Sequence, residues 1–386
     1  MRWIFLFLII VLSINYLVDV GFYLRNRFCR YHIGRWESFD QWVESVEKCA
    51  VRWLYRTPTV KITDNSRYIL LDCLKGKYNS DKIKSWQKAA LILGLSASNN
   101  PDNVRKAKTV AMSLLSKEGT WKTPPEAVDC GMLAFALLTV CDDPLSIKPA
   151  MDYSLKIIEK NMNREGIISY AGGAGNPELY VDTLGLVCPF LTLYARTYNV
   201  TGWEDVAFKQ LETFRKHGVL EKVILPNHAF NIDTKLPLGV YGWGRGAAWY
   251  LIGLLDTYNH CSNDHYKRKI REWMNEAIEA YLAFQREDGG FGSILQRKQT
   301  YDGSATVVMA WFFASLYHIT GDNRCKNASE KCMAAIKNRT RISGAIDWCQ
   351  GDTKEIGVFS QIYDIMPFAQ GMVLRGINKL MADNHE

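Results

Sequence analysis

The sequence predicts an all-α protein, in which six helical hairpins close into an (α/α)6 barrel behind one N-terminal membrane-anchor helix. Three observations lead to this prediction. About a dozen segments after Glu37 carry apolar residues at helical spacing, and convincing alternating strand patterns are absent. Turns that contain glycine also recur about every 50 residues, which is the length of two helices with their loops and is typical of stacked hairpins.

The first predicted helix is an apolar run over residues 3–18, which reaches Leu24 if Asp19 lies near the membrane interface. This length suits a membrane-spanning helix better than the shorter core of a signal peptide, and no small-x-small cleavage site follows it. We therefore expect an uncleaved membrane anchor and basic linker over residues 1–36. By the positive-inside rule, the arginines that follow the run favour a cytoplasmic domain, with export by a signal anchor as the alternative; they are Arg25, Arg27, Arg30 and Arg35.

The rest of the chain, residues 37–386, is expected to form the barrel as a single domain. Apolar residues at helical spacing predict its helices in order at residues 40–54, 84–95, 103–116, 130–140, 153–162, 187–198, 247–258, 270–284 and 307–319. The glycine-containing turns are expected at residues 118–121, 165–166, 288–291 and 344–348. Closure into a ring is inferred from the number of helices, because periodicity alone is also compatible with an open solenoid.

Composition fits a globular domain with an anionic small-molecule partner. Apolar residues make up 48% and charged residues 23% of 386 residues, and the net charge is +7. No long Lys/Arg run lies beyond the anchor, so nucleic-acid binding is not supported. The aromatic residues (12 Trp, 19 Tyr and 16 Phe) suit either a core or sugar stacking. The 10 cysteines form no C-x-x-C pair or zinc spacing, so we expect free thiols and no metal, although an exported domain could hold a disulfide.

Two acidic motifs precede apolar helices. Asp129 lies in the segment EAVDCG, and Asp182 lies in the segment ELYVDTLG together with Tyr180. An acid in this position commonly caps a helix. The glycine-rich loop at residues 170–175 and the tyrosines on both sides of it favour a cleft-lining position for Asp182.

A third motif combines glycine, tryptophan and arginine. His228 lies in NHAFN, and GWGRGAAW follows with Trp243, Arg245 and Trp249. Glycine is costly to order, so we expect that these glycines let a sugar approach the backbone. Arg245 is expected to hold a carboxylate through two parallel hydrogen bonds, and the two tryptophans to stack on sugar rings. A glycine-lined turn with a structural arginine is the simpler alternative.

Three further polar turns are ambiguous. The segments at residues 302–306, 347–352 and 366–371 precede or end helices, so their polar groups either face the same cleft or cap the last helices.

In order along the chain, EAVDCG, ELYVDTLG, NHAFN, GWGRGAAW, DGSATVVMAW and MPFAQGM resemble the unsaturated glucuronyl and rhamnogalacturonyl hydrolases, glycoside hydrolase families 88 and 105. The resemblance implies an (α/α)6 barrel, no metal and no cofactor. It also implies removal of a terminal Δ4,5-unsaturated uronic acid from an anionic oligosaccharide by hydration of the C4=C5 double bond. Matching positions make Asp182 the catalytic residue and Asp129 its partner, and they place His228, Trp243 and Arg245 against the substrate.

The chain departs from the family pattern at several positions. Tyr180 stands where Trp is common, Asn231 where Asp is common, Ala247 and Ala248 where Asn or Gly often occur, and Ala369 where Gly is common. These departures bear on which sugar is preferred. The alternatives are another (α/α)6 carbohydrate-active enzyme, such as an inverting hydrolase or a polysaccharide lyase, and a non-catalytic sugar-binding protein.

Overall fold

The computed structural model describes residues 1–31, 35–77, 79–80, 84–170 and 172–382. Within these ranges the α-helices are α1 (Arg2–Arg30), α2 (Phe39–Tyr55), α3 (Ile69–Leu74), α4 (Lys84–Ser96), α5 (Pro101–Ser113), α6 (Cys130–Val140), α7 (Lys148–Lys160), α8 (Val181–Tyr198), α9 (Trp203–His217), α10 (Gly244–His260), α11 (Asp264–Phe284), α12 (Gly303–Thr320), α13 (Asn323–Lys337) and α14 (Pro367–Met381). Short 3-10 turns occur at Pro144–Ile147 and Glu221–Val223.

The strands are short and lie in the loops, so the prediction of an all-α domain is confirmed. All pairs are antiparallel: β1 (Val60–Lys61) with β2 (Asn79–Ser80), β3 (Glu178–Tyr180) with β6 (Ala229–Asn231), β6 with β7 (Pro237–Leu238), β4 (Val219–Leu220) with β5 (Leu225–Pro226), β8 (Gly292–Ile294) with β9 (Arg297–Tyr301), and β10 (Cys349–Gln350) with β11 (Tyr363–Asp364).

The barrel consists of two layers of helices, an inner ring and an outer set packed against it. In the inner layer α4, α6, α8, α10, α12 and α14 each pack on the next, and α14 packs on α4, which closes the ring. In the outer layer α2, α5, α7, α9, α11 and α13 lie against them. Inner helices such as α12 are buried along most of their length, whereas outer helices such as α13 bury one apolar face, as expected for a layered structure.

Two glycines allow the ring to close between its last and first inner helices. A Cβ atom added to Gly94 in α4 would lie 2.3 Å from the carbonyl oxygen of Gly371 in α14. A Cβ atom added to Gly371 would lie 2.0 Å from the carbonyl oxygen of Ala90. Glycine at both positions therefore lets α4 and α14 approach closely.

Inner and outer helices alternate along the chain, so the inner helices all begin at the same end of the barrel. The loops that carry β3, β6, β8, β10 and β11 lead into these beginnings. The first turn of a helix exposes unpaired N–H groups and a partial positive charge. This end of the barrel is therefore suited to bind an anion.

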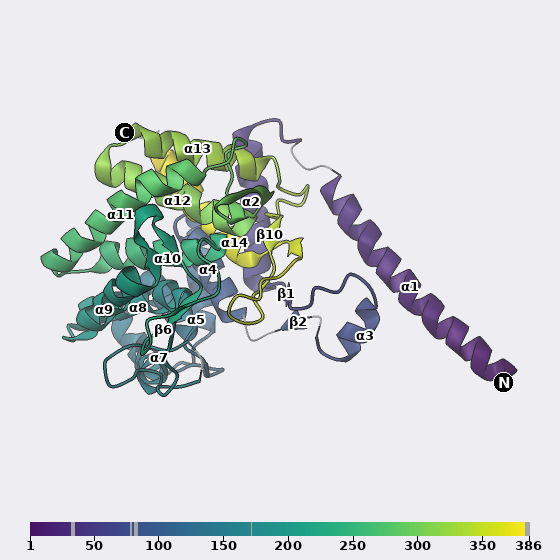
Figure 1. The fold of residues 1–386 in the computed structure, drawn as a ribbon, viewed down its shortest axis with the longest axis horizontal. Coiled ribbons are helices and arrows are strands. Elements are labelled where there is room, and N and C mark those ends of the chain that lie inside the picture. The colour runs from purple at the N-terminus through teal and green to yellow at the C-terminus, as the bar shows by residue number, and fades with distance from the viewer. Residues whose placement is uncertain (32–34, 78, 81–83, 171, 383–386) are drawn as a thin grey trace.

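Helix α1 projects away from the barrel as a long rod (Figure 1). In the described part of the chain it is the one helix long and apolar enough to cross a membrane, and only 6% of its most apolar window is buried. Its end is attached to the domain. Arg30 forms two hydrogen bonds with the buried carboxylate of Asp347, at 2.7 and 2.9 Å. Asp19 accepts hydrogen bonds from the backbone N–H groups of Tyr68 and Ile69 and so caps α3.

Candidate active site

Asp182 is positioned by a strand pair and the first turn of α8. Strand β3 pairs with β6 so that Tyr180 lies opposite Ala229. The backbone N–H of Val181 then donates to the carbonyl oxygen of His228 at 2.9 Å. The helix starts at Val181, six residues before the apolar pattern predicted it. The side chains of Asp182 and His228 are thus held beside each other at the beginning of an inner helix.

The carboxyl group of Asp182 faces a cavity of about 250 Å³. Its Oδ2 atom has no hydrogen-bond partner among the described residues and lies 3.6 Å from Nε2 of His228. Burial raises the pKa of Asp182 to about 7, while the Arg245 guanidinium lowers it and the Asp352 carboxylate raises it further. Near neutral pH a large fraction of Asp182 is therefore protonated, which is the form that a general acid requires.

His228 is neutral at physiological pH. Burial and the positive charge of Arg245 lower its pKa to about 4. The backbone N–H of Gly357 donates to Nδ1 at 3.2 Å, which places the single ring proton on Nε2. The imidazole therefore presents an N–H donor toward Oδ2 of Asp182.

Asp129 lies next to the cavity rather than in its lining. It stands at the N-terminus of α6 without capping the helix through its side chain, and it accepts a hydrogen bond from Oγ of Ser85 at 3.0 Å. Burial raises its pKa to about 6, and Asp352 adds to the increase. Tyr170 lies close enough to all three acids to feel their charges, since burial and then the charges of Asp129, Asp182 and Asp352 raise its pKa.

Arg245 uses its donors to fix the backbone of the segment at residues 350–352. Its Nη1 donates to the carbonyl oxygen of Gln350, and its Nη2 donates to that of Gly351 at 2.7 Å. Nη2 also lies 3.8 Å from a carboxylate oxygen of Asp352. Arg245 lines the cavity as predicted, but two of the donors expected to hold a substrate carboxylate bind protein carbonyl groups instead.

Aromatic side chains form much of the cavity wall. Trp86, Tyr170, Tyr180 and Trp249 line it, and Trp86 meets Trp249 edge-on at 5.5 Å between ring centroids. Trp243 lies outside the lining. Its ring is 4.7 Å from the imidazole of His228, and its Nε1 donates to Oε1 of Gln350 at 3.0 Å. Trp243 therefore packs against His228 from outside the cavity.

The glycines of GWGRG make room for protein rather than for a sugar. A Cβ atom on Gly244 would lie 2.3 Å from the carbonyl oxygen of Gly292, and one on Gly246 would lie 2.6 Å from the ring of Trp243. Gly242 has a φ of +80°, which favours glycine at the turn before α10. These contacts do not support the expectation that the glycines of GWGRG let a sugar approach the backbone.

Sequence reasoning did not assign Asp352, Tyr170 or Trp86 to the site, although all three line the cavity. Asp352 and Tyr170 belong to turns that the sequence marks as ambiguous or glycine-rich. Trp86 lies in no sequence motif that marks it as a site residue. The other acids of the ambiguous turns have structural roles: Asp347 binds Arg30 and Arg341, and Asp302 caps α12 and accepts from the backbone N–H of Gln350.

A buried carboxyl group with a raised pKa faces an aromatic-walled cavity at the N-terminal ends of the inner helices of an (α/α)6 barrel. This arrangement defines a class, the carbohydrate-active enzymes that use acid catalysis. The model of Glycosyl Hydrolase Family 88 matches residues 73–363, more than half of the chain, and the chain belongs to this family. Membership confirms the resemblance to family 88 drawn from the motifs, and with it the class of the enzyme, a glycoside hydrolase.

Solved structures of low sequence identity share the fold. A possible member of the GH105 family from Salmonella enterica serovar Paratyphi A is 15% identical with a TM-score of 0.72, over 90% of this chain and 96% of that one. An unsaturated glucuronyl hydrolase specific for heparin is 16% identical with a TM-score of 0.66, over 90% and 99%. The unsaturated glucuronyl hydrolase from Bacillus sp. GL1 is 14% identical with a TM-score of 0.63, over 90% and 97%. A search of curated proteins gave no match.

Proposed function

We propose that this glycoside hydrolase removes a terminal Δ4,5-unsaturated uronic acid, of glucuronyl or rhamnogalacturonyl type, from a short oligosaccharide by hydrating the C4=C5 bond. The observation that carries the proposal is Asp182, whose pKa of about 7 and unpartnered Oδ2 give the cavity an acid that holds a proton near neutral pH. Similar enzymes among the solved structures act on unsaturated glucuronides by their descriptions, which supports the same substrate class here.

The reaction begins with proton transfer from Asp182 to C4 of the sugar. Positive charge develops at C5 and is shared with the ring oxygen. Water adds to C5 and gives its proton to the Asp182 carboxylate, which restores the acid. The resulting hemiketal opens to a ketone at C5, and the hemiacetal left at C1 releases the neighbouring sugar as an alcohol.

The surrounding residues have supporting roles in this proposal. His228 directs its Nε2–H toward the reacting acid, and Asp129 helps to orient the acid or the water. Trp249 and Tyr180 stack against the sugar rings. The charge of Arg245 and the beginnings of the inner helices attract the uronate carboxylate.

The position of Asp352 supports one alternative function, ordinary inverting hydrolysis. It is a second carboxyl group in the same cavity, and ordinary inverting hydrolysis requires two carboxyl groups on opposite sides of the glycosidic bond. The two reactions differ in when the double bond is lost, because hydration destroys its ultraviolet absorbance before the sugar is released, whereas ordinary hydrolysis first releases a uronate that still carries the double bond. A lyase would create absorbance.

The experiment supplies the full chain with unsaturated disaccharides produced by pectin and glycosaminoglycan lyases and follows this absorbance. We expect loss with at least one of them, in parallel with release of the second sugar. Release of sugar ahead of the loss of absorbance would replace the proposal with the inverting reaction.

We also propose that α1 is an uncleaved membrane anchor with the barrel on the cytoplasmic side. The ion pair between Arg30 and the buried Asp347 supports retention of α1, because its removal would deprive a buried carboxylate of one of its two arginines. The basic residues after the apolar run support the orientation. Intact mass of the protein from membranes tests retention, and protease protection of sealed vesicles tests orientation.

A further inference from the structure

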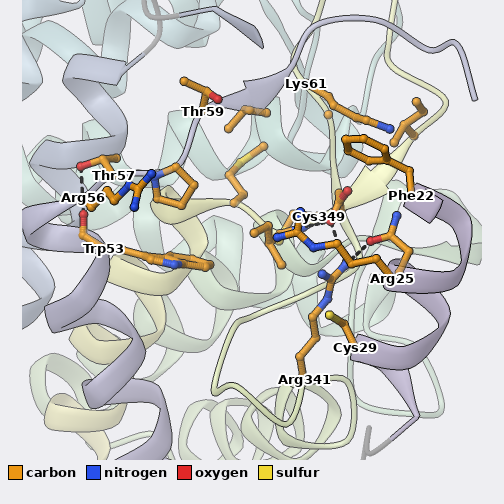
Figure 2. A pocket seen from close by; sticks show the side chains of 18 of the residues that line it. Phe22, Arg25, Cys29, Trp53, Arg56, Thr57, Thr59, Lys61, Arg341 and Cys349 are labelled. Carbon is orange, nitrogen blue, oxygen red and sulfur yellow. Dashed lines mark hydrogen bonds and ion pairs between the residues drawn. The ribbon is translucent and has the colours of Figure 1, made fainter. Parts of the chain in front are cut away.

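A second cavity, of about 610 Å³, lies between the end of α1 and the barrel. Figure 2 shows Phe22 and Arg25 on α1 facing Trp53 and Arg56 on the barrel side. Arg341 lies below these residues in the same view and also lines the cavity. This space is separate from the active site, although both are bounded by neighbouring residues of the segment at residues 349–352.

The cavity lining has a large excess of positive charge. Six of its residues are basic and one is acidic. The acid, Asp364, accepts a hydrogen bond from Arg341 at 2.8 Å, and Arg341 also binds Asp347, so this arginine is already paired with protein carboxylates. The basic residues are Arg25, Arg52, Arg56, Lys61, Lys84 and Arg341. Such a lining is arranged to receive an anionic group.

The cavity lining is also partly apolar. Trp53, Val60 and Met366 are buried side chains that line it, and Phe22 contributes an aromatic ring from α1. The fit is therefore to a molecule that joins an anionic group to an apolar body. Phe22 lies on α1 between this cavity and the exposed apolar side chains nearer the start of the helix.

The position of the cavity along α1 matches the headgroup layer of a bilayer. Arg25 directly follows Leu24, to which the apolar run extends, so it stands at the boundary between the hydrocarbon core and the headgroup layer. The headgroup layer on each side of the hydrocarbon core is about 5–8 Å thick. With the apolar run in the hydrocarbon core, the Arg25 side chain starts at the inner edge of this layer and is long enough to reach the phospholipid phosphates.

We propose that this cavity binds the headgroup of one anionic phospholipid, with its acyl chains along α1. This inference rests on the proposed membrane anchor. The phosphate is held by Arg25 from the anchor and by Arg56 from the barrel, so that the lipid joins the two parts of the molecule. Basic pockets beside transmembrane helices recognise anionic headgroups by this combination of charge and apolar contact.

The test uses the full chain in neutral detergent, titrated with short-chain phosphatidylglycerol or phosphatidylcholine, with bound lipid counted by native mass spectrometry. We expect one phosphatidylglycerol to bind saturably and phosphatidylcholine to bind much more weakly. The double variant Arg25→Gln/Arg56→Gln should weaken binding about twenty-five-fold, since each basic contact at a membrane surface contributes about fivefold.

The matched control is Arg27→Gln/Arg67→Gln, which removes the same charge near α1 outside this cavity. It should leave saturable binding within about twofold, because neither side chain lines the cavity. Equal weakening by both double variants would overturn the proposal in favour of general charge attraction. Preferential binding of acidic disaccharides over phosphatidylglycerol would also overturn it.

Flotation of the full chain with neutral phosphatidylcholine vesicles separates this inference from the anchor itself. If the full chain does not float with these vesicles, the proposal that α1 is a membrane anchor is wrong. Flotation together with equal binding of both short-chain lipids contradicts the cavity proposal alone.

Discussion

Nε2 of His228 and Oδ2 of Asp182 are 3.6 Å apart, and the backbone N–H of Gly357 fixes the imidazole so that its proton faces the acid. The pKa of the imidazole is about 4 and that of the acid is about 7. Between these values the pair consists of a neutral base and a neutral acid. His228 therefore contributes a hydrogen bond donor, and Asp182 is the group that supplies a proton.

The pH dependence of activity should follow the ionisation of Asp182. We expect kcat/KM to fall as pH rises through about 7, because the acid then loses its proton. Asp352→Asn removes a nearby negative charge and should move this decline to lower pH. The exposed substitution Asp233→Asn is the control and should leave the profile in place. A decline at the same pH in Asp352→Asn and the wild type would show that Asp352 does not act on Asp182.

Stability should reveal the same ionisation independently of activity. The folded state holds the proton of Asp182 more tightly than the unfolded state, so this group makes the protein less stable as pH rises from about 4 to 7. Asp182→Asn should therefore raise the melting temperature at pH 8 and change it little at pH 4. Thermal unfolding at both values is the measurement, and an equal change at both would contradict the raised pKa.

The ion pair at the end of α1 should stabilise the barrel. Arg30→Ala removes two hydrogen bonds to the buried Asp347 and leaves Arg341 as its charged partner, so we expect a loss of about 1–3 kcal/mol. Arg30→Lys should recover part of the loss, since it keeps the charge without the two-pronged geometry. Arg27→Ala on the same helix should have little effect. Chemical denaturation in neutral detergent measures the free energies, and equal values for Arg30→Ala and Arg27→Ala would contradict the role of the pair.

Closure of the ring should depend on Gly371. Gly371→Ala places a methyl group against the backbone of Ala90 and should cost about 1–3 kcal/mol of folding free energy or more. Gly175→Ala is the matched control, because a Cβ atom there meets no neighbour within 4 Å. Unfolding in denaturant compares the two variants. A Gly371→Ala protein as stable as Gly175→Ala would mean that α4 and α14 can separate without cost.

The sequence predicted those parts of the site that lie in one motif at the beginning of one helix. Tyr180 and Asp182 stand together at the start of α8, and Arg245 and Trp249 lie in the first turns of α10, so short motifs identified them as candidates, and they line the same cavity. Because these first turns contain glycine and polar residues, the apolar pattern predicted the starts of α8 and α10 several residues too late.

The remaining parts depend on how the ring closes. Asp352 and Trp86 are 266 positions apart and reach the same cavity only because α14 packs on α4. The partners of Arg245 and the position of Trp243 behind His228 also depend on the segment at residues 350–352. Patterns within one helix contain no information about such contacts.

The most direct measurement compares the wild type with Asp182→Asn on an unsaturated uronyl disaccharide near pH 6, by following the absorbance of the double bond with both proteins shown to be folded. Loss of a positioned general acid should reduce the rate by about 10²–10⁴-fold. A steady decrease with the wild type and almost none with the variant is the predicted result. Equal rates for the two folded proteins would contradict the role of Asp182 as the proton donor.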